Sequence, residues 1–301
     1  MLSLFYHPIY TYGIDKKSRF PRDRYKLIFN KLKKSNSNLI FYYPKLVDKN
    51  EIALAHDPKY IDLFLTDRLP KQERRRIGLQ PWSDNIIDRT RLILGGSIGA
   101  LKKAVENRGI AANMAGGTHH AHYAYGSGYC VFNDLAICAR KAIRDYDNIS
   151  KIMIIDLDVH QGDGTAAILK NDKDIFTLSL HCESNFPLKK MKSSLDINLK
   201  KQTKDNEYLM ILRQTLDEIS TLDCDLLFFQ AGVDTLVSDK LGHLSLTRDG
   251  LMIRNQMVLD FAKAKRIPVV VFMGGGYSEP ISKTVDVFVE LFEQCSNYVI
   301  N

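Results

Sequence analysis

The chain passes from an apolar run, Lys151–Asp156, into the polar stretch Leu157-Asp158-Val159-His160-Gln161-Gly162-Asp163-Gly164. An apolar run without alternation is typical of a strand that is buried on both faces of a parallel sheet. The N-terminal run that begins at Met1 predicts one more strand. Four further runs have the same character and also end in polar or glycine residues: Ile110–Asn113, Asp174–Leu180, Asp225–Gln230 and Pro268–Met273.

Segments with helical spacing of apolar residues lie between these runs. Alternation of strands and helices predicts the α/β class, with a mostly parallel central sheet flanked by helices. No linker or repeat divides the chain, so we expect residues 1–301 to form a single domain. In such a sheet the ligand site lies at the carboxyl ends of the strands. The expected helices are Asp84–Asn107 behind a Ser83 cap, Asn133–Asp145, Asp205–Ile219, Thr247–Lys265 and Glu279–Cys295.

The composition is typical of a globular protein. Of 301 residues, 42 are Lys or Arg and 35 are Asp or Glu, which gives a net charge of +7. The excess lies in short runs such as Lys31–Lys34, Lys71–Arg76 and Lys189–Lys192, which are more typical of a solvated face than of a nucleic-acid groove. No apolar stretch reaches the roughly 18 residues of a membrane span, and the N-terminus lacks secretory features. Five cysteines without a C-x-x-C pair argue against disulfides and a thiolate zinc site, so we expect a cytoplasmic protein.

The polar stretch after the first quoted run has the composition of a metal site. If the backbone stays extended, Asp156, Asp158 and His160 point to one side, so two of them can bind one metal ion. The glycines on either side of Asp163 are expected to allow a sharp turn that returns this carboxylate to the same place. An Asp-rich strand end could instead cap the next helix, but that would bury several carboxylates for one cap. Asp234, after another buried strand, is the expected third ligand and leaves coordination positions open for water and a substrate carbonyl.

Two further polar segments follow buried strands. Gly116-Gly117-Thr118-His119-His120 carries adjacent histidines, and each imidazole needs an orienting partner. Asp156 and Asp163 can supply these partners, and two His-Asp pairs beside a metal are suited to acid–base catalysis. Gly274-Gly275-Gly276-Tyr277 would bring a tyrosine hydroxyl close enough to donate to a developing oxyanion. A hydrogen-bonded core histidine and a simple glycine turn are the alternatives at these two segments.

Taken together, these motifs resemble the zinc-dependent histone deacetylase family, whose domain has the arginase-like α/β fold. The resemblance extends from the first strand through His56-Asp57-Pro58-Lys59-Tyr60 to Glu279. It looks closest to the class IV, or eleventh-isoform-like, branch in three segments: Asp156–Gly162 with glutamine at Gln161, Asp205–Leu209 and Leu241–Leu246.

The resemblance implies a role for each residue of the site. His120 would act as the general base, held by Asp163, and Tyr277 would polarise the acyl carbonyl. His119 would be the electrostatic partner of the base, held by Asp156. Zinc, or iron(II) in its place, would be bound by Asp158, His160 and Asp234. A structural potassium ion would be bound by Asp156, Asp158, His160, Ser179 and Leu180, and the acyl-lysine tunnel would be lined by Gly128, Tyr129, Phe186 and Leu241.

The implied function is zinc-dependent hydrolysis that removes acyl groups, acetyl or longer, from lysine side chains of proteins or peptides. An acetylpolyamine or another small amide is an alternative substrate, because the same chemistry would apply. A two-manganese arginase or agmatinase is disfavoured, since Gly162 and Gly232 stand where those enzymes have further carboxylates. A catalytically inactive binding module is disfavoured because no ligand, histidine or tyrosine has been lost. We expect an acylated substrate, no nucleic acid and no membrane span, while oligomeric state and a nuclear or exported location stay open.

Overall fold

The computed structural model describes residues 1–35 and 37–298 and contains one eight-stranded sheet with the order β2-β1-β3-β8-β7-β4-β5-β6. Every neighbouring pair of strands is parallel, so the sheet is entirely rather than mostly parallel. The strands are β1 Leu2–Phe5, β2 Leu39–Tyr42, β3 Ile110–Asn113, β4 Ile152–Asp156, β5 Ile175–Cys182, β6 Leu195–Leu199, β7 Leu226–Gln230 and β8 Val269–Phe272.

The two edge strands are the ones that the sequence does not reveal. β2 and β6 are only partly buried, and β6 mixes apolar with polar residues in Leu195-Asp196-Ile197-Asn198-Leu199. The central strands β3, β4, β7 and β8 are buried along their whole length, as their continuous apolar character predicts.

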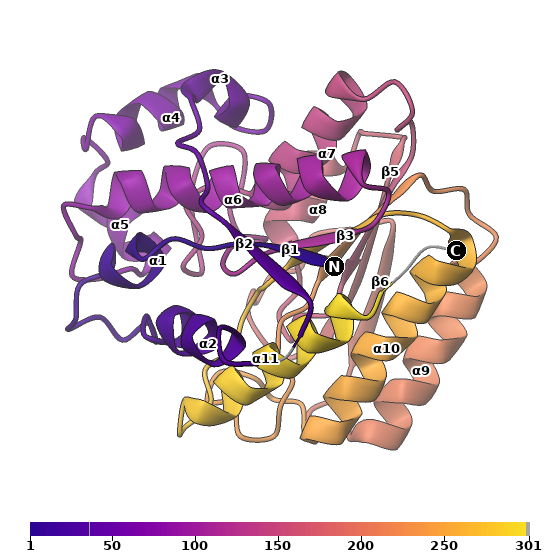
Figure 1. Cartoon of the computed structure of the whole chain (residues 1–301). Coiled ribbons are helices and arrows are strands. Elements are labelled where there is room, and N and C mark those ends of the chain that lie inside the picture. Colours follow the sequence, from indigo (N-terminus) through magenta and orange to yellow (C-terminus); the bar gives the residue numbers. More distant parts are fainter. Residues whose placement is uncertain (36, 299–301) are drawn as a thin grey trace.

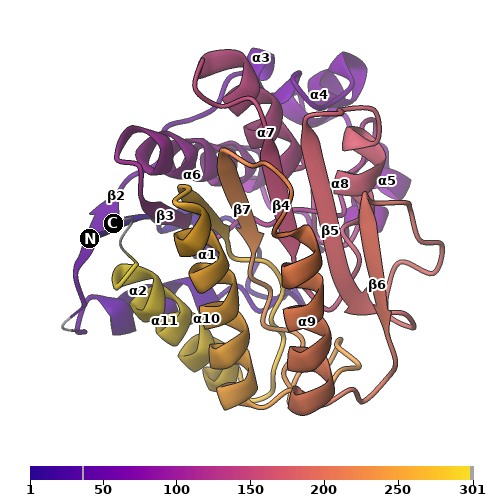
Figure 2. The same ribbon diagram turned by 90° about the vertical axis from the view of Figure 1, so that its right-hand side faces the viewer.

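Helices cover both faces of the sheet (Figures 1 and 2). α6, α7 and α8 lie on one face, and α9, α10, α11 and α2 lie on the other. Among the described residues, no helix combines the length and the apolar character that a membrane crossing requires. The helices are α1 Ile9–Tyr12, α2 Arg24–Leu32, α3 Lys49–Ile52, α4 Pro58–Leu65, α5 Lys71–Ile77, α6 Ile86–Glu106, α7 Asp134–Asp145, α8 Asp163–Leu169, α9 Asp205–Ile219, α10 Arg248–Lys265 and α11 Ser282–Ser296.

Two expected helix starts are wrong by a few residues. Asn85 rather than Ser83 is the N-cap residue of α6, and the Ser83 hydroxyl instead accepts a hydrogen bond from the Asn85 N–H at 3.2 Å. α11 begins at Ser282 rather than Glu279. Thr247 does cap α10, since its hydroxyl accepts the N–H of Gly250 at 3.0 Å.

The register of the central strands brings their carboxyl ends together. Asp156 at the end of β4 is paired with Gln230 at the end of β7, which is paired in turn with Phe272 at the end of β8. The polar segments after these strands therefore leave the sheet at one level, where the site is expected in an open parallel sheet.

A close contact of α6 gives a test of this packing. A Cβ atom built on Gly95 would lie 1.8 Å from the backbone oxygen of Lys45, so the helix can approach this segment only through a glycine. Gly95→Ala should therefore lower the free energy of unfolding by about 1–3 kcal/mol, although alanine is favoured in a helix interior by about 1 kcal/mol. Urea denaturation of both proteins measures the difference.

Gly109→Ala is the matched control, because its Cβ would meet only the Asn107 oxygen at 3.7 Å. This control should stay within about 0.5 kcal/mol of the parent. A gain of stability in Gly95→Ala would contradict the packing described for α6.

Candidate metal and acid–base site

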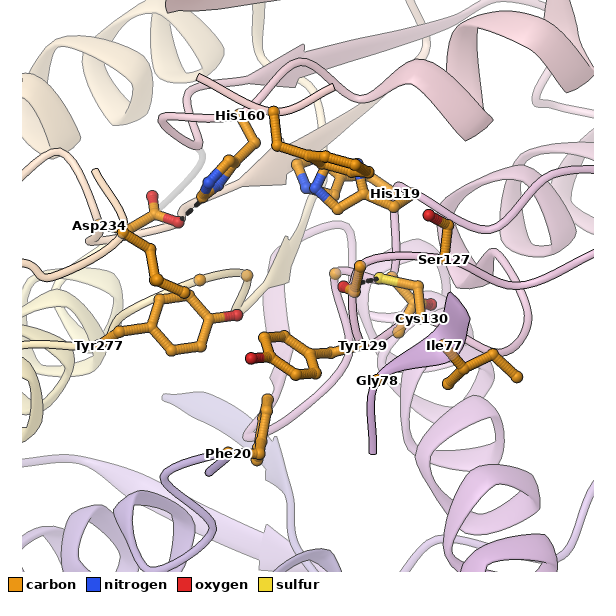
Figure 3. Close-up of a pocket in the computed structure, with 18 of the residues that line it drawn as sticks. Phe20, Ile77, Gly78, His119, Ser127, Tyr129, Cys130, His160, Asp234 and Tyr277 are labelled. Carbon is orange, nitrogen blue, oxygen red and sulfur yellow. Dashed lines mark hydrogen bonds and ion pairs between the residues drawn. The ribbon is translucent and has the colours of Figure 1, made fainter. Parts of the chain in front are cut away.

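Three expected metal ligands meet at the carboxyl end of the sheet. Asp158 and His160 lie in the loop after β4, and Asp234 lies in the loop after β7. One ligand atom from each residue lies within 4.8 Å of the others. His160 Nδ1 is 3.1 Å from Asp158 Oδ1 and 3.2 Å from Asp234 Oδ2, and Figure 3 shows His160 and Asp234 facing one another.

The charges of this group favour a bound cation. Burial disfavours a charged imidazole, but hydrogen bonds to Asp158 and Asp234 outweigh burial and raise the pKa of His160 to about 10. Burial and repulsion from Asp158 raise the pKa of Asp234 to about 7. Two buried carboxylates and one imidazole, open toward a cavity, form a donor set that fits a catalytic zinc ion or a similar divalent ion.

The glycines after β8 bring the backbone against these carboxylates. The Gly275 N–H donates to Asp158 Oδ2 at 2.8 Å, and a Cβ at Gly275 would lie 1.9 Å from Asp234 Oδ2. Gly274 has a φ of +71°, which an L-side chain rarely adopts. The glycine segment is thus the close backbone approach that the sequence predicts, rather than a simple turn.

Two buried arginines, which the sequence does not single out, hold the loops of the site. Arg254 in α10 donates to the carbonyl oxygen of Gly232 at 2.7 Å and of Leu157 at 3.3 Å. Arg24 in α2 donates to the carbonyl oxygen of Gly276 at 3.0 Å. An arginine within a helix usually reaches solvent, so only the burial in the fold reveals these roles.

The adjacent histidines each face their expected aspartate. His119 Nδ1 is 2.7 Å from Asp156 Oδ2, and His120 Nδ1 is 2.6 Å from Asp163 Oδ1. Burial disfavours charge on His119, but Asp156 and Asp158 outweigh it and raise the pKa to about 9. Burial and the charge on His119 lower the pKa of His120 to about 4, against the effect of Asp163. Near neutral pH, one imidazole is therefore charged and its neighbour is neutral.

The expected sharp turn beside Asp163 is present. Gly162 has a φ of −73° and a ψ of 64°, and the Asp163 N–H donates to the Gln161 carbonyl oxygen at 2.8 Å, which closes an inverse γ-turn just before α8. A Cβ at Gly162 would lie 2.4 Å from Asp156 Oδ2, and one at Gly164 would lie 2.2 Å from the Ala121 oxygen. Absence of a side chain, rather than backbone freedom, is what these positions require.

His122 is a residue of the site that the sequence reasoning missed. Its Nε2 atom lies 2.9 Å from Asp163 Oδ2, so one carboxylate bridges His120 and His122. Burial opposes ionisation, but these two imidazoles outweigh it and hold the pKa of Asp163 well below its usual range. The ring of His122 stacks on Tyr125 at 4.5 Å. In the sequence, the position of His122 two residues after His120 is the signal that could have identified it.

A cavity of about 1060 Å³ joins these groups. Figure 3 shows the side chains of Tyr277 and Tyr129 side by side below Asp234, and their ring centroids are 5.9 Å apart. Burial raises the pKa of Tyr277 well above its usual value, so its hydroxyl keeps its proton and can donate. The cavity is also lined by the expected tunnel residues Gly128, Tyr129, Phe186 and Leu241.

Of the expected potassium ligands, Asp156, Ser179 and Leu180 do not line the cavity, and neither does Gln161. Ser179 of β5 is paired with Asp156 of β4, beside the loop that carries Asp158. Gln161 is buried and contacts both β6 and the segment before it, since its amide N–H donates to Asp196 Oδ1 in β6 at 2.8 Å and its side-chain carbonyl accepts the Met191 N–H at 2.8 Å. Gln161 thus fixes the loop that precedes β6.

Comparisons with known proteins identify relatives over most of the chain. The family model described as "Histone deacetylase domain" matches residues 18–291. An uncharacterized protein of Picosynechococcus sp. is 42% identical over 283 residues, which are 93% of both chains. Histone deacetylase 2 of Arabidopsis thaliana is 34% identical over 201 residues, which are 65% of this chain and 51% of that protein. Acetoin utilization protein AcuC of Bacillus subtilis is 28% identical over 266 residues, which are 80% of this chain and 68% of AcuC.

A solved structure has the same fold. The HDA15 HD domain superposes with a TM-score of 0.82 at 18% identity and covers 99% of this chain and 90% of its own. This likeness confirms the α/β fold that the strand and helix pattern predicts.

The ligand geometry predicts one tightly bound divalent ion per chain. Addition of Zn²⁺ to metal-free protein should saturate at one equivalent and raise the melting temperature, because an ion that binds only the folded state stabilises it. Asp234→Asn should weaken binding by about 100-fold or more, because a ligand carboxylate is lost. Asp172→Asn is the control, since Asp172 pairs with Arg140 away from the site. Two tightly bound ions, or an unchanged affinity in Asp234→Asn, would contradict this ligand set.

Proposed function

Because the chain belongs to the histone deacetylase family, we propose that it is a zinc-dependent hydrolase that removes acyl groups from lysine side chains of proteins or peptides. Family membership supports a deacetylase-type hydrolase. The finer proposal rests on one observation: the metal group Asp158, His160 and Asp234 lines the same cavity as His119, His120 and Tyr277.

Each residue of the site has a separate role in the proposed reaction. A zinc ion held by the three ligands would act as a Lewis acid toward the acyl carbonyl and the attacking water. His120 is neutral near pH 7, so its ring can accept the proton of that water while Asp163 holds its Nδ1 atom. Tyr277 keeps its proton and donates it as a hydrogen bond to the carbonyl oxygen. A protonated histidine then supplies the proton that the leaving lysine amine needs.

The cavity suits a neutral acyl-lysine. Tyr129 and Phe186 offer aromatic surface to the alkyl stem, and the ring of Phe186 lies 4.9 Å from that of His120. The cavity also reaches Ile93 and Arg89 of α6, which gives room for acyl groups longer than acetyl. The class IV assignment is part of the proposal and rests on sequence motifs around Gln161.

The proposed potassium site would use the residues around the end of β4. Side chains or backbone of five residues would hold the ion: Asp156, Asp158, His160, Ser179 and Leu180. The adjacent register of Asp156 and Ser179 supports this placement.

Two alternatives to the proposed reaction are a two-metal site and a small acetylated substrate. A two-metal arginase-like site would need carboxylates at Gly162 and Gly232, where a Cβ would lie 2.4 Å from Asp156 Oδ2 and 2.2 Å from Asp158 Oδ2. Neither position has space for a side chain. A small acetylated substrate, such as an acetylpolyamine, is favoured by the similarity to a protein named for acetoin utilization.

Hydrolysis of an acetyl-lysine peptide by the zinc-loaded protein tests the proposed reaction. Tyr277→Phe should lower kcat by about 100- to 1000-fold, because one donor to the oxyanion is lost. Tyr123→Phe is the matched control, since this exposed tyrosine does not line the cavity. Faster turnover of acetylspermidine than of any acyl-lysine peptide would contradict the proposed substrate, and unchanged kcat in Tyr277→Phe would contradict the role of its hydroxyl.

The bridge between His122 and Asp163 predicts a pH effect. In His122→Phe, Asp163 loses one donor and stabilises the charged form of His120 more strongly, so the pKa of His120 rises from about 4. Because His120 must be neutral to accept a proton, activity should be lost at a higher pH during acidification. A full pH profile of kcat/KM measures the shift, which we expect to be about one pH unit.

His122→Gln keeps an N–H donor near Asp163 and should lie closer to the parent profile. Thermal unfolding of each variant separates this effect from a loss of folding. An identical acidic limb in His122→Phe and in the parent would show that His122 does not act through Asp163.

A further inference from the structure

The mouth of the cavity carries basic side chains from two separate segments. Lys17 and Arg19 come from the loop between α1 and α2, and Arg75 and Arg76 come from α5. All four line the cavity that contains the metal ligands. A substrate that reaches the metal group therefore passes these cations.

Both segments are anchored beside the tunnel residue Tyr129. Its N–H donates to the carbonyl oxygen of Ile77, the last residue of α5, at 2.7 Å. Its ring packs edge-on against Phe20 with centroids 5.2 Å apart, as the two neighbouring rings in Figure 3 show. Arg75 lies two residues before Ile77, and Arg19 lies next to Phe20. Contacts with Tyr129 thus hold the segments that carry Arg75 and Arg19 beside the tunnel.

Most of this positive charge is not neutralised. Arg76 forms an ion pair with Glu73, and the Asp15 carboxylate accepts the backbone N–H of Lys17 at 2.7 Å. Within residues 1–35 and 37–298, no carboxylate forms an ion pair with the exposed side chains of Lys17, Arg19 and Arg75.

The carboxylates that line the cavity lie at its base. Among the described residues that line it, the carboxylates are those of Asp158 and Asp234, both buried at the metal group. Asp239 lies near the mouth, but its carboxylate accepts three backbone N–H groups. Lys190 adds a further ammonium group beside the tunnel, where it donates to two backbone carbonyls at 2.6 Å. Among the described residues that line the cavity, the exposed charged side chains are therefore all basic.

We propose that this mouth selects acyl-lysine residues that are flanked by acidic residues in a peptide or protein. The proposal rests on the proposed hydrolysis of acyl-lysine and names its substrate class. Acidic side chains on either side of the acyl-lysine can pair with Arg19 and Arg75, whereas a Lys-rich tail or a cationic polyamine is repelled.

Three acetyl-lysine peptides of equal length, with Glu, Gln or Lys at the flanking positions, provide the test with the zinc-loaded protein. The kcat/KM value should decrease in the order Glu, Gln, Lys, with about a tenfold span at low salt. The span should shrink at about 0.5 M NaCl, because salt screens exposed charges. The double variant R19E/R75E should reverse the order.

Arg213→Glu is the matched control, because Arg213 is an exposed cation of α9 that does not line the cavity. This control should keep the order of the parent. Equal kcat/KM values for all three peptides, or the reverse order, would overturn the proposed selectivity while hydrolysis itself stood. Absence of turnover with every peptide would overturn the proposed reaction and this selectivity together, so the two failures are distinguishable.

Discussion

The surrounding structure depends on three buried carboxylates at the carboxyl ends of the central strands, Asp156, Asp158 and Asp234. Removing such groups from water costs several kcal/mol each unless charges and hydrogen bonds replace the water. The fold provides that replacement from every side. His119 faces Asp156, and His160 contacts the other two carboxylates. A divalent cation held by Asp158, His160 and Asp234 would complete the compensation, so the proposed metal site would also lower the cost of burying these carboxylates.

The same carboxylates explain why the pKa values of the neighbouring His119 and His120 differ. His119 lies near Asp156 and Asp158, whereas His120 lies near Asp163 and beside the charged His119. The ring centroids of these two imidazoles are 4.1 Å apart, so both rings do not readily carry a positive charge at once. His119, which has two carboxylates beside it, is the one that becomes charged. Two adjacent residues of the same type therefore have pKa values shifted in opposite directions, because the charges around each imidazole differ.

Features that arise from local chemistry could be predicted from the sequence, and features that arise from packing could not. The buried strands, the metal group and the His-Asp pairs follow from apolar runs that end in titratable residues. β6 was missed because an edge strand needs no continuous apolar run. Arg254 was missed because its role depends on burial against loops more than 20 residues away in sequence. The lack of space for a Cβ at Gly162 was missed because its neighbour Asp156 is placed there by the tertiary fold.

The position of the basic run Lys71–Arg76 in the fold gives its charge a role that the sequence does not indicate. From the sequence, it is a solvated basic segment, and most of its residues are indeed exposed. The fold places Arg75 and Arg76 at the mouth of a cavity whose base is anionic. In the proposed reaction, a neutral acyl-lysine would pass this mouth without a charge penalty, whereas the free lysine amine would take up a proton beside the carboxylates at the base. The positive mouth that would favour acidic flanking residues would also oppose the exit of that ammonium group, so selection of substrate and release of product would place opposite demands on the same charges.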